Sequence, residues 1–298
     1  MMMSIMYIGN YNNMRIFAII LFSALLFVLD GNAQEKALAK VHYKFRHIND
    51  TTKRDQPLRD DVVTYLGNHS SFYTSYTDNL IKADLDAQKL VSDYTGHLTV
   101  NFSTTPIKDF YLINSQSKST NWMQAISSSF DIYVVESDYE VPKWVLLEDL
   151  KEIGGYRCQK AKTTFKGRVY TAWFTSEIPF HFGPWILHGL PGLIMSAEDE
   201  KGEVSFEYNG FDKISEKDEV MIDVPYYGIK ASQAEIDKLK KVFEEDQSNY
   251  YKTLVSSGRF SIGSDFFGIE NGKNTVDMKF AEDYKPSFKT NNPIEIVK

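Results

Sequence analysis

The stretch from Ile178 to Ala197, IPFHFGPWILHGLPGLIMSA, constrains the fold more than any other part of the chain. It sets three prolines and three glycines among large apolar residues. Proline fixes φ and glycine permits positive φ, so the stretch predicts a rigid and sharply turned connection. Because the connection is apolar, we expect it to be buried, with its backbone groups hydrogen-bonded to the sheet on which it packs.

Within this stretch, Leu190 to Leu193 predict a type II turn. Pro191 stands at the second position of the turn and Gly192 at the third, where this turn type requires a positive φ. A β-branched residue resists positive φ, so Gly192 is expected to be intolerant of substitution.

Apolar and polar residues alternate along most of the remaining chain, which predicts β-strands with one buried face. In the first such segment, Val41, Tyr43 and Phe45 alternate with polar residues. The chain also contains 20 Phe and 18 Tyr, which favour β structure. Short turns such as Lys166-Gly167 join neighbouring segments, so we expect an antiparallel meander rather than a parallel nucleotide-binding sheet.

One helix is clearly indicated in the C-terminal third. Ser232-x-x-Glu235 is a capping box, in which each side chain bonds a free backbone N–H at the helix start. Apolar residues then recur at helical spacing, at Ile236, Leu239 and Phe243. We expect this amphipathic helix to pack on the sheet. A weaker helical pattern covers residues 79–91.

Residues 1–33 have the pattern of a secretory signal peptide. An apolar run extends from Ile16 to Leu29, and small residues at Gly31 and Ala33 predict cleavage after Ala33. The run is shorter than the roughly 20 residues of a membrane-spanning helix, so no span is expected after cleavage; an uncleaved anchor is the alternative. The residues before Met14 are interpreted as the product of a misassigned start codon.

The residues Gly189 to Ile194 read GLPGLI, and further motifs surround them. These are Trp144, Gly155-Tyr156-x-Cys158, Ala161, Tyr170-x-Ala172-Trp173-Phe174, Ile178-Pro179 and Gly183-Pro184, and the chain closes with Asn292-Pro293-Ile294-Glu295-Ile296. Together they resemble the GLPGLI family of bacterial exported proteins, over nearly the whole mature chain.

The resemblance implies a cell-envelope protein of Bacteroidetes-type bacteria, often encoded near outer-membrane transport genes, with no established activity. It implies a structural or binding role for the signature loop, which comprises Ile178, Pro179, Gly183, Pro184, Trp185, Gly189, Leu190, Pro191, Gly192, Leu193 and Ile194. A weaker resemblance, to the bowl-like N-terminal domain of a bacterial peptide N-glycosidase, implies a curved sheet.

Charge and motifs exclude several functions. The net charge is −7 and no long Lys or Arg run occurs, which argues against nucleic-acid binding. The metalloprotease, paired-cysteine and serine-hydrolase motifs are absent from the sequence, and the glycines at 268–275 are spaced one residue too closely for a phosphate-binding loop. The single cysteine, Cys158, is expected to be a small buried residue in a strand. No cofactor is expected.

Two sets of residues in or near the signature loop are candidates for binding. His181 and His188 are the candidate metal ligands, although no carboxylate or cysteine in the stretch completes a set of three. Tyr170, Trp173 and Trp185 are candidate binding aromatics, because aromatic side chains with polar tips are favoured at recognition surfaces. Burial in the core is the alternative for all three. No catalytic residue is indicated.

We therefore predict a signal peptide followed by a single β-rich domain over 34–298. Its fold is a curved antiparallel sheet or half-barrel, with one packed amphipathic helix and an extended C-terminal tail. The function expected from these features is that of an exported periplasmic or secreted protein. It would be a non-catalytic binding module that works with an outer-membrane transporter or another envelope protein. An envelope hydrolase with a site invisible in sequence, and a purely structural envelope component, are the alternatives.

Overall fold

The computed structural model describes residues 35–126, 132–224, 228–246 and 275–296. The expected signal peptide and the glycines at 268–272 lie outside these residues, so the structure does not bear on either prediction. Contacts divide the chain into a unit of residues 1–34 and a unit of residues 35–298. Within the described residues, no helix has the length and apolar character needed to cross a membrane.

A sheet of twelve strands forms the main body of the second unit, and the mainly β prediction is confirmed. The spatial order of its strands is β15-β8-β7-β6-β4-β3-β2-β13-β12-β11-β10-β9. The strands span β2 (Ala39–His47), β3 (Leu58–Leu66), β4 (Ser70–Ser75), β6 (Asp109–Asn114), β7 (Ser119–Ala125), β8 (Ile132–Asp138), β9 (Val145–Ile153), β10 (Tyr156–Phe165), β11 (Arg168–Thr175), β12 (Leu193–Asp199), β13 (Val204–Lys213) and β15 (Ile229–Lys230).

Most neighbouring strands are antiparallel, as the short turns predicted. In the β10–β11 hairpin, Phe165 pairs with Arg168 across Lys166 and Gly167, whose φ values are 46° and 78°. Two positive φ values define the primed turn that matches the twist of a two-residue hairpin. The short strand β15 is an exception, because it pairs with β8 in parallel.

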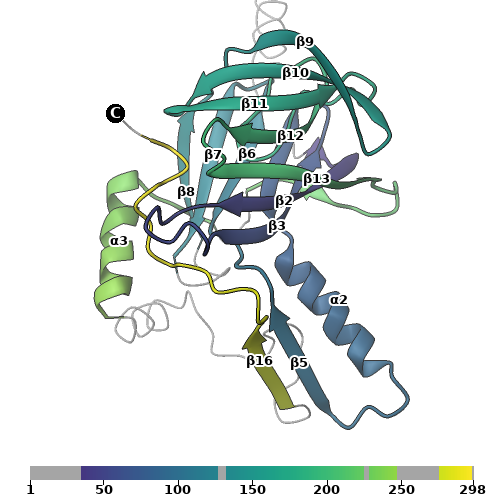
Figure 1. Cartoon of the computed structure of the whole chain (residues 1–298), viewed down its shortest axis with the longest axis vertical. Coiled ribbons are helices and arrows are strands. Elements are labelled where there is room, and N and C mark those ends of the chain that lie inside the picture. Colours follow the sequence, from purple (N-terminus) through teal and green to yellow (C-terminus); the bar gives the residue numbers. More distant parts are fainter. Residues whose placement is uncertain (1–34, 127–131, 225–227, 247–274, 297–298) are drawn as a thin grey trace, which may run out of the picture. The chain divides into compact units, whose positions relative to one another are not determined.

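The sheet is curved, and the largest core cluster fills its inner face. In Figure 1 the strands from β9 to β13 run across the view, whereas β6 to β8 run along it. The cluster joins Val41, Tyr43 and Phe45 of β2 to buried residues of β6, β10, β11 and β12. A second cluster, which includes Phe110 and Met123, lies on the opposite face of β6 to β8, because side chains alternate along each strand.

The weaker helical pattern at residues 79–91 also forms a helix, in addition to the packed helix of the C-terminal third. Helix α2 (Thr77–Lys89) buries only Thr77 and Leu85, and it starts without a side-chain cap. That sparse burial explains the weak sequence signal. The chain continues into β5 (His97–Phe102), which leaves the main sheet and pairs in parallel with β16 (Thr275–Phe280). A second two-stranded sheet joins β1 (Glu35–Lys36) to β14 (Met221–Ile222).

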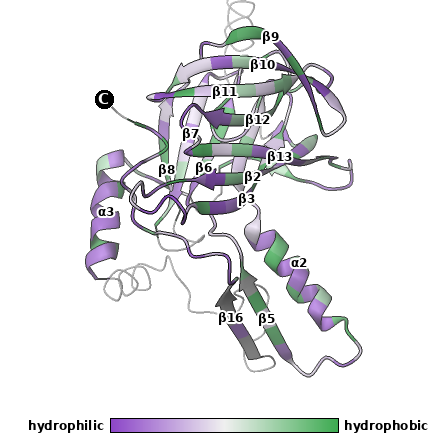
Figure 2. Cartoon of the chain, in the orientation of Figure 1, coloured by the Kyte–Doolittle hydropathy of each residue, from purple (hydrophilic) through white to green (hydrophobic). Residues whose placement is uncertain are grey.

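Helix α3 (Gln233–Glu245) forms where the capping box predicted it. The Ser232 hydroxyl accepts from the Glu235 N–H, and the Glu235 carboxylate accepts from the Ser232 N–H. Its apolar stripe packs Ile236 against Ile126 and Tyr133 at the β8 end of the sheet. The rest of the helix is largely hydrophilic, as expected for an element that buries only one stripe (Figure 2).

Candidate functional site

The signature loop fills the inner face of the sheet beneath β10 to β13. The side chains of Trp185, Leu187 and Leu190 are at most 2% exposed, and Leu193 and Ile194 of β12 are fully buried. Pro179, Gly189 and Pro191 are the exposed members of the loop. Most of the loop is therefore part of the hydrophobic core.

The backbone of this loop is hydrogen-bonded to the sheet and to itself. The Thr64 hydroxyl of β3 donates to the Gly183 carbonyl at 3.0 Å, and the Tyr43 hydroxyl of β2 donates to the Ile194 carbonyl at 2.6 Å. The Trp144 indole donates to the His188 carbonyl at 2.8 Å. These bonds satisfy buried carbonyl groups that would otherwise be costly.

The predicted type II turn at 190–193 is wrong, although the positive φ of Gly192 is confirmed. The φ of Gly192 is 145°, far from the value near 80° of that turn type. The Leu193 N–H donates to the Ile178 carbonyl, and the Gly192 N–H donates to the Leu190 carbonyl. The chain thus makes a tighter, three-residue turn around Pro191. A Cβ at Gly192 would overlap the carbonyl of Thr175.

Each of the two loop histidines is hydrogen-bonded to a different backbone carbonyl. His181 donates from Nδ1 to the Leu190 carbonyl at 2.9 Å, and His188 donates from Nε2 to the Glu140 carbonyl at 3.0 Å. Burial lowers the pKa of His188 to about 4, which keeps its ring neutral. Within the described residues, no three His, Cys, Asp or Glu side chains form a group that could hold a metal ion.

The three candidate binding aromatics occupy different places. Tyr170 and Trp185 are 0% and 2% exposed, so they pack in the core and present no surface to a ligand. Trp173 is partly exposed, but Lys151 places its ammonium 4.3 Å from the ring centroid and Lys160 at 5.6 Å. Cations already cover that ring.

Trp185 instead organises the aromatic side chains around it. Its backbone φ of 55° is unusual for a non-glycine residue and is held by the surrounding packing. Its ring centroid lies 6.4 Å from that of Tyr111, 6.0 Å from Phe165 and 5.9 Å from Tyr170. Tyr111 and Phe165 in turn form part of the wall of a pocket.

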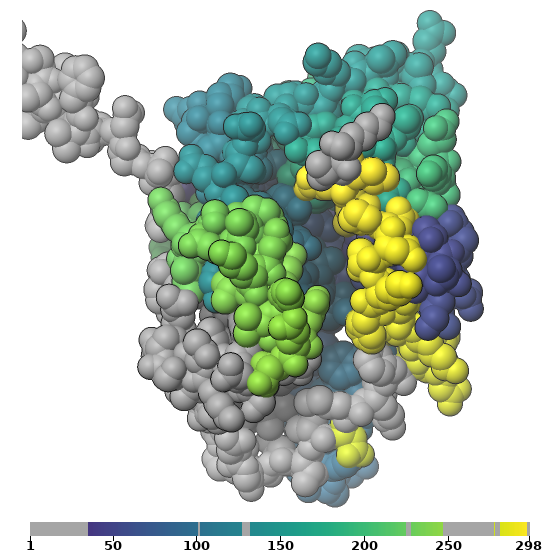
Figure 3. Space-filling model, turned by 90° about the vertical axis from the view of Figure 1, so that its left-hand side faces the viewer, coloured from purple at the N-terminus to yellow at the C-terminus, as the bar shows by residue number. Residues whose placement is uncertain are grey.

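This pocket, which we call the cleft pocket, has a volume of about 180 Å³. Its wall combines residues of β6 to β8 with Ile186 and His188 of the loop. Figure 3 shows the surface hollowed between α3 and the C-terminal tail (281–296), with residues of the sheet at the floor. Its lining residues are Tyr111, Thr120, Trp122, Val135, Ser137, Asp138, Glu140, Phe165, Lys166, Ile186, His188, Gln233 and Glu295.

Charged groups from three segments meet at the cleft pocket. The Lys166 ammonium lies 2.7 Å from Glu140 Oε1 and 4.0 Å from Glu295 Oε2. The Tyr111 hydroxyl reaches Glu295 Oε1 only at 3.4 Å. Burial raises the pKa of the Glu295 carboxyl, against the opposing effects of Lys166 and Tyr111. Glu295 is thus a partly buried carboxyl without a close donor among the described residues.

Trp122 is a partly exposed aromatic residue of the cleft pocket, and a hydrogen bond orients its ring. Its indole N–H donates to Asp109 Oδ1 at 2.9 Å, and the Gln124 amide donates to the same oxygen at 2.6 Å. Burial raises the pKa of Asp109, although both donors favour its charged form. The Lys240 ammonium of α3 lies 5.9 Å from the Trp122 ring centroid.

The tail reaches the pocket because a buried polar network, which we call the latch, anchors it. Arg168 of β11 donates from Nη1 to Asp199 at 2.7 Å and to Glu203 at 3.3 Å. From Nη2 it donates to the Asn292 side chain at 2.6 Å and to the Pro293 carbonyl at 2.7 Å. Its Nε donates to the Ile294 carbonyl at 3.0 Å. The guanidinium therefore holds the tail backbone directly.

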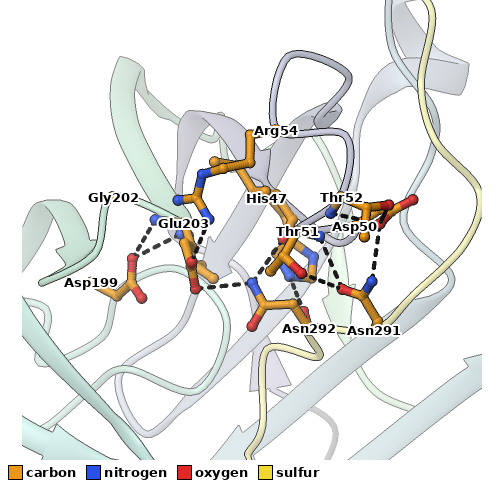
Figure 4. Close-up of polar contacts among 12 residues, drawn as sticks. His47, Asp50, Thr51, Thr52, Arg54, Asp199, Gly202, Glu203, Asn291 and Asn292 are labelled. Carbon is orange, nitrogen blue, oxygen red and sulfur yellow. Dashed lines mark hydrogen bonds and ion pairs between the residues drawn. The ribbon is translucent and has the colours of Figure 1, made fainter.

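The remaining groups of the latch complete the network (Figure 4). The Asn292 amide donates to the Ile48 carbonyl at 2.8 Å and to Glu203 at 3.0 Å. His47 donates to the Asn292 carbonyl at 2.7 Å, and burial lowers its pKa to about 4. Glu203 also accepts from Arg54 at 2.9 Å. Burial disfavours the charge of Glu203, but these hydrogen bonds lower its pKa overall.

Sequence reasoning singled out the signature loop but neither the latch nor the cleft pocket. Their members come from many elements, namely β2, β6, β7, β8, β10, β11, β12, α3, the tail and the connections between them, and no local spacing links them. The closing Asn292 to Ile296 was the one available signal, since it belongs to the motif residues and supplies both Asn292 and Glu295. Cys158 lies fully buried in β10, as expected.

Comparisons with known proteins give a short family match. A family model described as a protein of unknown function (Porph_ging) matches residues 162–196, a range that includes the GLPGLI residues. No curated protein matches. Two solved structures of PNGF-II, in space groups P21 and C2, are similar at 13% identity, with TM-scores of 0.45 and 0.46. The matches cover 68% and 69% of this chain, which spans about a third (32%) of the PNGF-II chains.

Proposed function

We propose that this chain is an exported GLPGLI-family protein of the cell envelope and acts as a non-catalytic binding module. Its ligand would occupy the cleft pocket. One observation carries this proposal: aromatic and charged side chains from β6, β7, β10 and the tail converge on a pocket that the core leaves open. A concave site with a few convergent polar groups is the default place for ligand recognition.

Two features support recognition over simple packing. The orientation of Trp122 is fixed from behind by Asp109, and the tail that contributes Glu295 is fixed by Arg168. Side chains held in place in this way lose little conformational entropy when a ligand binds. The match of the family model to residues 162–196 supports membership of the GLPGLI family, because it includes the signature loop.

The binding test uses the indole signals of the four tryptophans in an NMR spectrum. The Trp122 signal is assigned with Trp122→Phe, and the protein is titrated with peptides, oligosaccharides and small amines. We expect at least one class to shift the Trp122 signal and leave that of Trp173 unchanged. If no class shifts Trp122 at millimolar concentration, the cleft pocket is not a binding site.

Export and partnership require separate tests in cells. The protein recovered from the envelope fraction should begin at Gln34. A photo-crosslinking residue at Gln233, on the rim of the cleft pocket, should capture an outer-membrane transport protein, whereas the same group at Lys201 should not. Full-length protein in the cytoplasm would contradict export, and equal capture at both positions would contradict a partner at this face.

An envelope hydrolase is the second candidate, favoured by the carboxyls of Glu140 and Glu295, which approach the same Lys166 ammonium. A carboxyl whose pKa is raised is suited to act as a general acid, and Glu295 meets that condition. This alternative expects Glu295→Gln to abolish turnover of a bound ligand without preventing its binding. Recovery of unaltered ligand after prolonged incubation would count against it.

A further inference from the structure

Lys166 shows that carboxylates of the cleft pocket already hold an ammonium group. Its Nζ lies 2.7 Å from Glu140 and 4.0 Å from Glu295, and 5.7 Å from the centroid of the Phe165 ring. Carboxylates and aromatic faces are the two partners that a primary ammonium prefers. The wall of the pocket thus combines both partners around one intramolecular cation.

Glu295 retains capacity for a second cation. Its contacts with Tyr111 at 3.4 Å and Lys166 at 4.0 Å are longer than normal hydrogen bonds to a carboxylate. Its side chain is 36% exposed, so one side is open to an incoming group. Asp199 in the latch, by contrast, has Arg168 at 2.7 Å and is 3% exposed.

The rest of the lining selects for a small cationic group. The three carboxylates of Asp138, Glu140 and Glu295 outnumber the two ammonium groups, Lys166 and Lys240, so the site favours a cation over an anion. Trp122 is partly exposed and adds aromatic surface beside these charges, although Lys240 lies 5.9 Å from its ring centroid. The volume of about 180 Å³ is below the roughly 300–1,000 Å³ of pockets for larger ligands. The pocket therefore suits one side chain or one small molecule.

We propose that the cleft pocket binds an alkyl ammonium group beside Glu295 and Trp122, supplied by a lysine side chain of a polypeptide or by a free small amine. This inference rests on the proposed function, because it names the ligand class of the same pocket. The ammonium would lie between the Glu295 carboxylate and the Trp122 ring, while Lys166 remains paired with Glu140.

The experiment titrates the full chain with four probes and follows the Trp122 indole signal. Nα-acetyl-lysine methylamide represents a polypeptide side chain and 1,5-diaminopentane a free amine, and their relative affinities identify the source. The Nε-acetylated lysine derivative and the norleucine derivative keep the alkyl chain but lack the charge. We expect saturable binding of at least one charged probe, and at least tenfold weaker binding of both neutral ones.

Two substitutions should change this affinity in opposite directions. Glu295→Gln removes the open carboxylate and should weaken binding of the charged probes at least tenfold. Lys166→Asn removes the competing ammonium, and asparagine tolerates the positive φ of this turn position, so affinity should rise several-fold. Glu282→Gln, an exposed change elsewhere on the tail, should leave affinity unchanged. A purely structural effect of the substitutions would not give opposite signs.

The outcomes separate this inference from the proposed function. Equal binding of charged and neutral probes, or an unchanged affinity in Glu295→Gln, would overturn ammonium recognition. If a neutral oligosaccharide shifts Trp122 and no amine does, the binding function stands and the ligand class is wrong. If nothing shifts Trp122, both proposals fail together.

Discussion

The inner face of the sheet is completed in two different ways. In the closed region, formed by the signature loop and the latch, apolar side chains fill the space and the Arg168 guanidinium makes hydrogen bonds through each of its three nitrogens. In the open region, the cleft pocket, space remains, and the contacts of Glu295 with other described residues are long. Asn292 and Glu295 are three residues apart on the same tail, yet each belongs to a different region.

This difference distinguishes polar groups that hold the fold from those that remain available. A buried charge is retained at little net cost only when close partners surround it, as in the latch. A carboxyl that lacks such partners contributes little to stability, but it keeps the capacity to bind a ligand. The comparison therefore predicts large stability effects in the closed region and small ones in the open region.

The largest effect is expected from Arg168→Met. The substitution leaves Asp199 buried without its cation and Glu203 with Arg54 alone, so the free energy of unfolding should fall by about 3–5 kcal/mol. Chemical denaturation measures the change. Arg59→Met is the matched control, since Arg59 pairs with Asp283 of the same tail at an exposed site and should cost below about 1 kcal/mol. Equal losses of unfolding free energy in the two variants would show that the buried ion pairs of the latch stabilise the fold no more than the exposed pair does.

A somewhat smaller loss is expected from Gly192→Ala in the signature loop. The added Cβ meets the Thr175 carbonyl, and the φ of 145° is unfavourable for alanine, so the loss should be on the order of 2–4 kcal/mol. Gly155→Ala tests backbone strain alone, because its φ is also positive but nothing lies within 4 Å of the new Cβ. If the loss of stability at Gly192 is no larger than that at Gly155, the signature loop accommodates the added methyl group without a steric penalty.

Asp60 provides an intermediate case, with close donors but no cationic partner in the described part of the chain. Thr77 and Ser75 donate to its Oδ1 at 2.6 and 3.1 Å, and the Ile107 N–H donates to its Oδ2 at 2.7 Å. Burial nevertheless raises the pKa of Asp60 to about 7, from an ordinary value of 3.8. The folded state therefore holds a proton that the unfolded state has already released between pH 4 and pH 7.

Its contribution to stability is present below pH 4 and is lost as the pH rises through 7. The slope should be about −1.4 kcal/mol per pH unit within that window. Asp60→Asn should remove this slope, which is measured as the difference in unfolding free energy between the two proteins. Both proteins contain His47 and His188, whose lowered pKa values give the opposite pH dependence, so the histidine contributions cancel in this difference. Exposed Asp86→Asn should leave the slope unchanged; an unchanged slope in Asp60→Asn would show that its three donors keep the carboxyl ionised.

The sequence predicted those parts of the fold that depend on local spacing. Alternation located β2, the capping box located α3, and Lys166-Gly167 located the β10–β11 turn, because each depends on neighbouring residues. Helix α2 was only weakly indicated, since it buries little. The latch joins Arg168 to residues more than 120 positions away, and the cleft pocket joins Trp122 to Glu295. No local pattern encodes such pairings, so both required the structure.

The smallest effect is expected at the centre of the open region. Glu295→Gln should change the free energy of unfolding by less than about 1 kcal/mol, because its contacts with Tyr111 and Lys166 are long and its side chain is partly exposed. Denaturation beside Arg168→Met, in the same buffer, measures the contrast within one tail. A loss approaching that of Arg168→Met would mean that Glu295 holds the tail in place. Its long contacts would then no longer indicate that the carboxylate is available to a ligand.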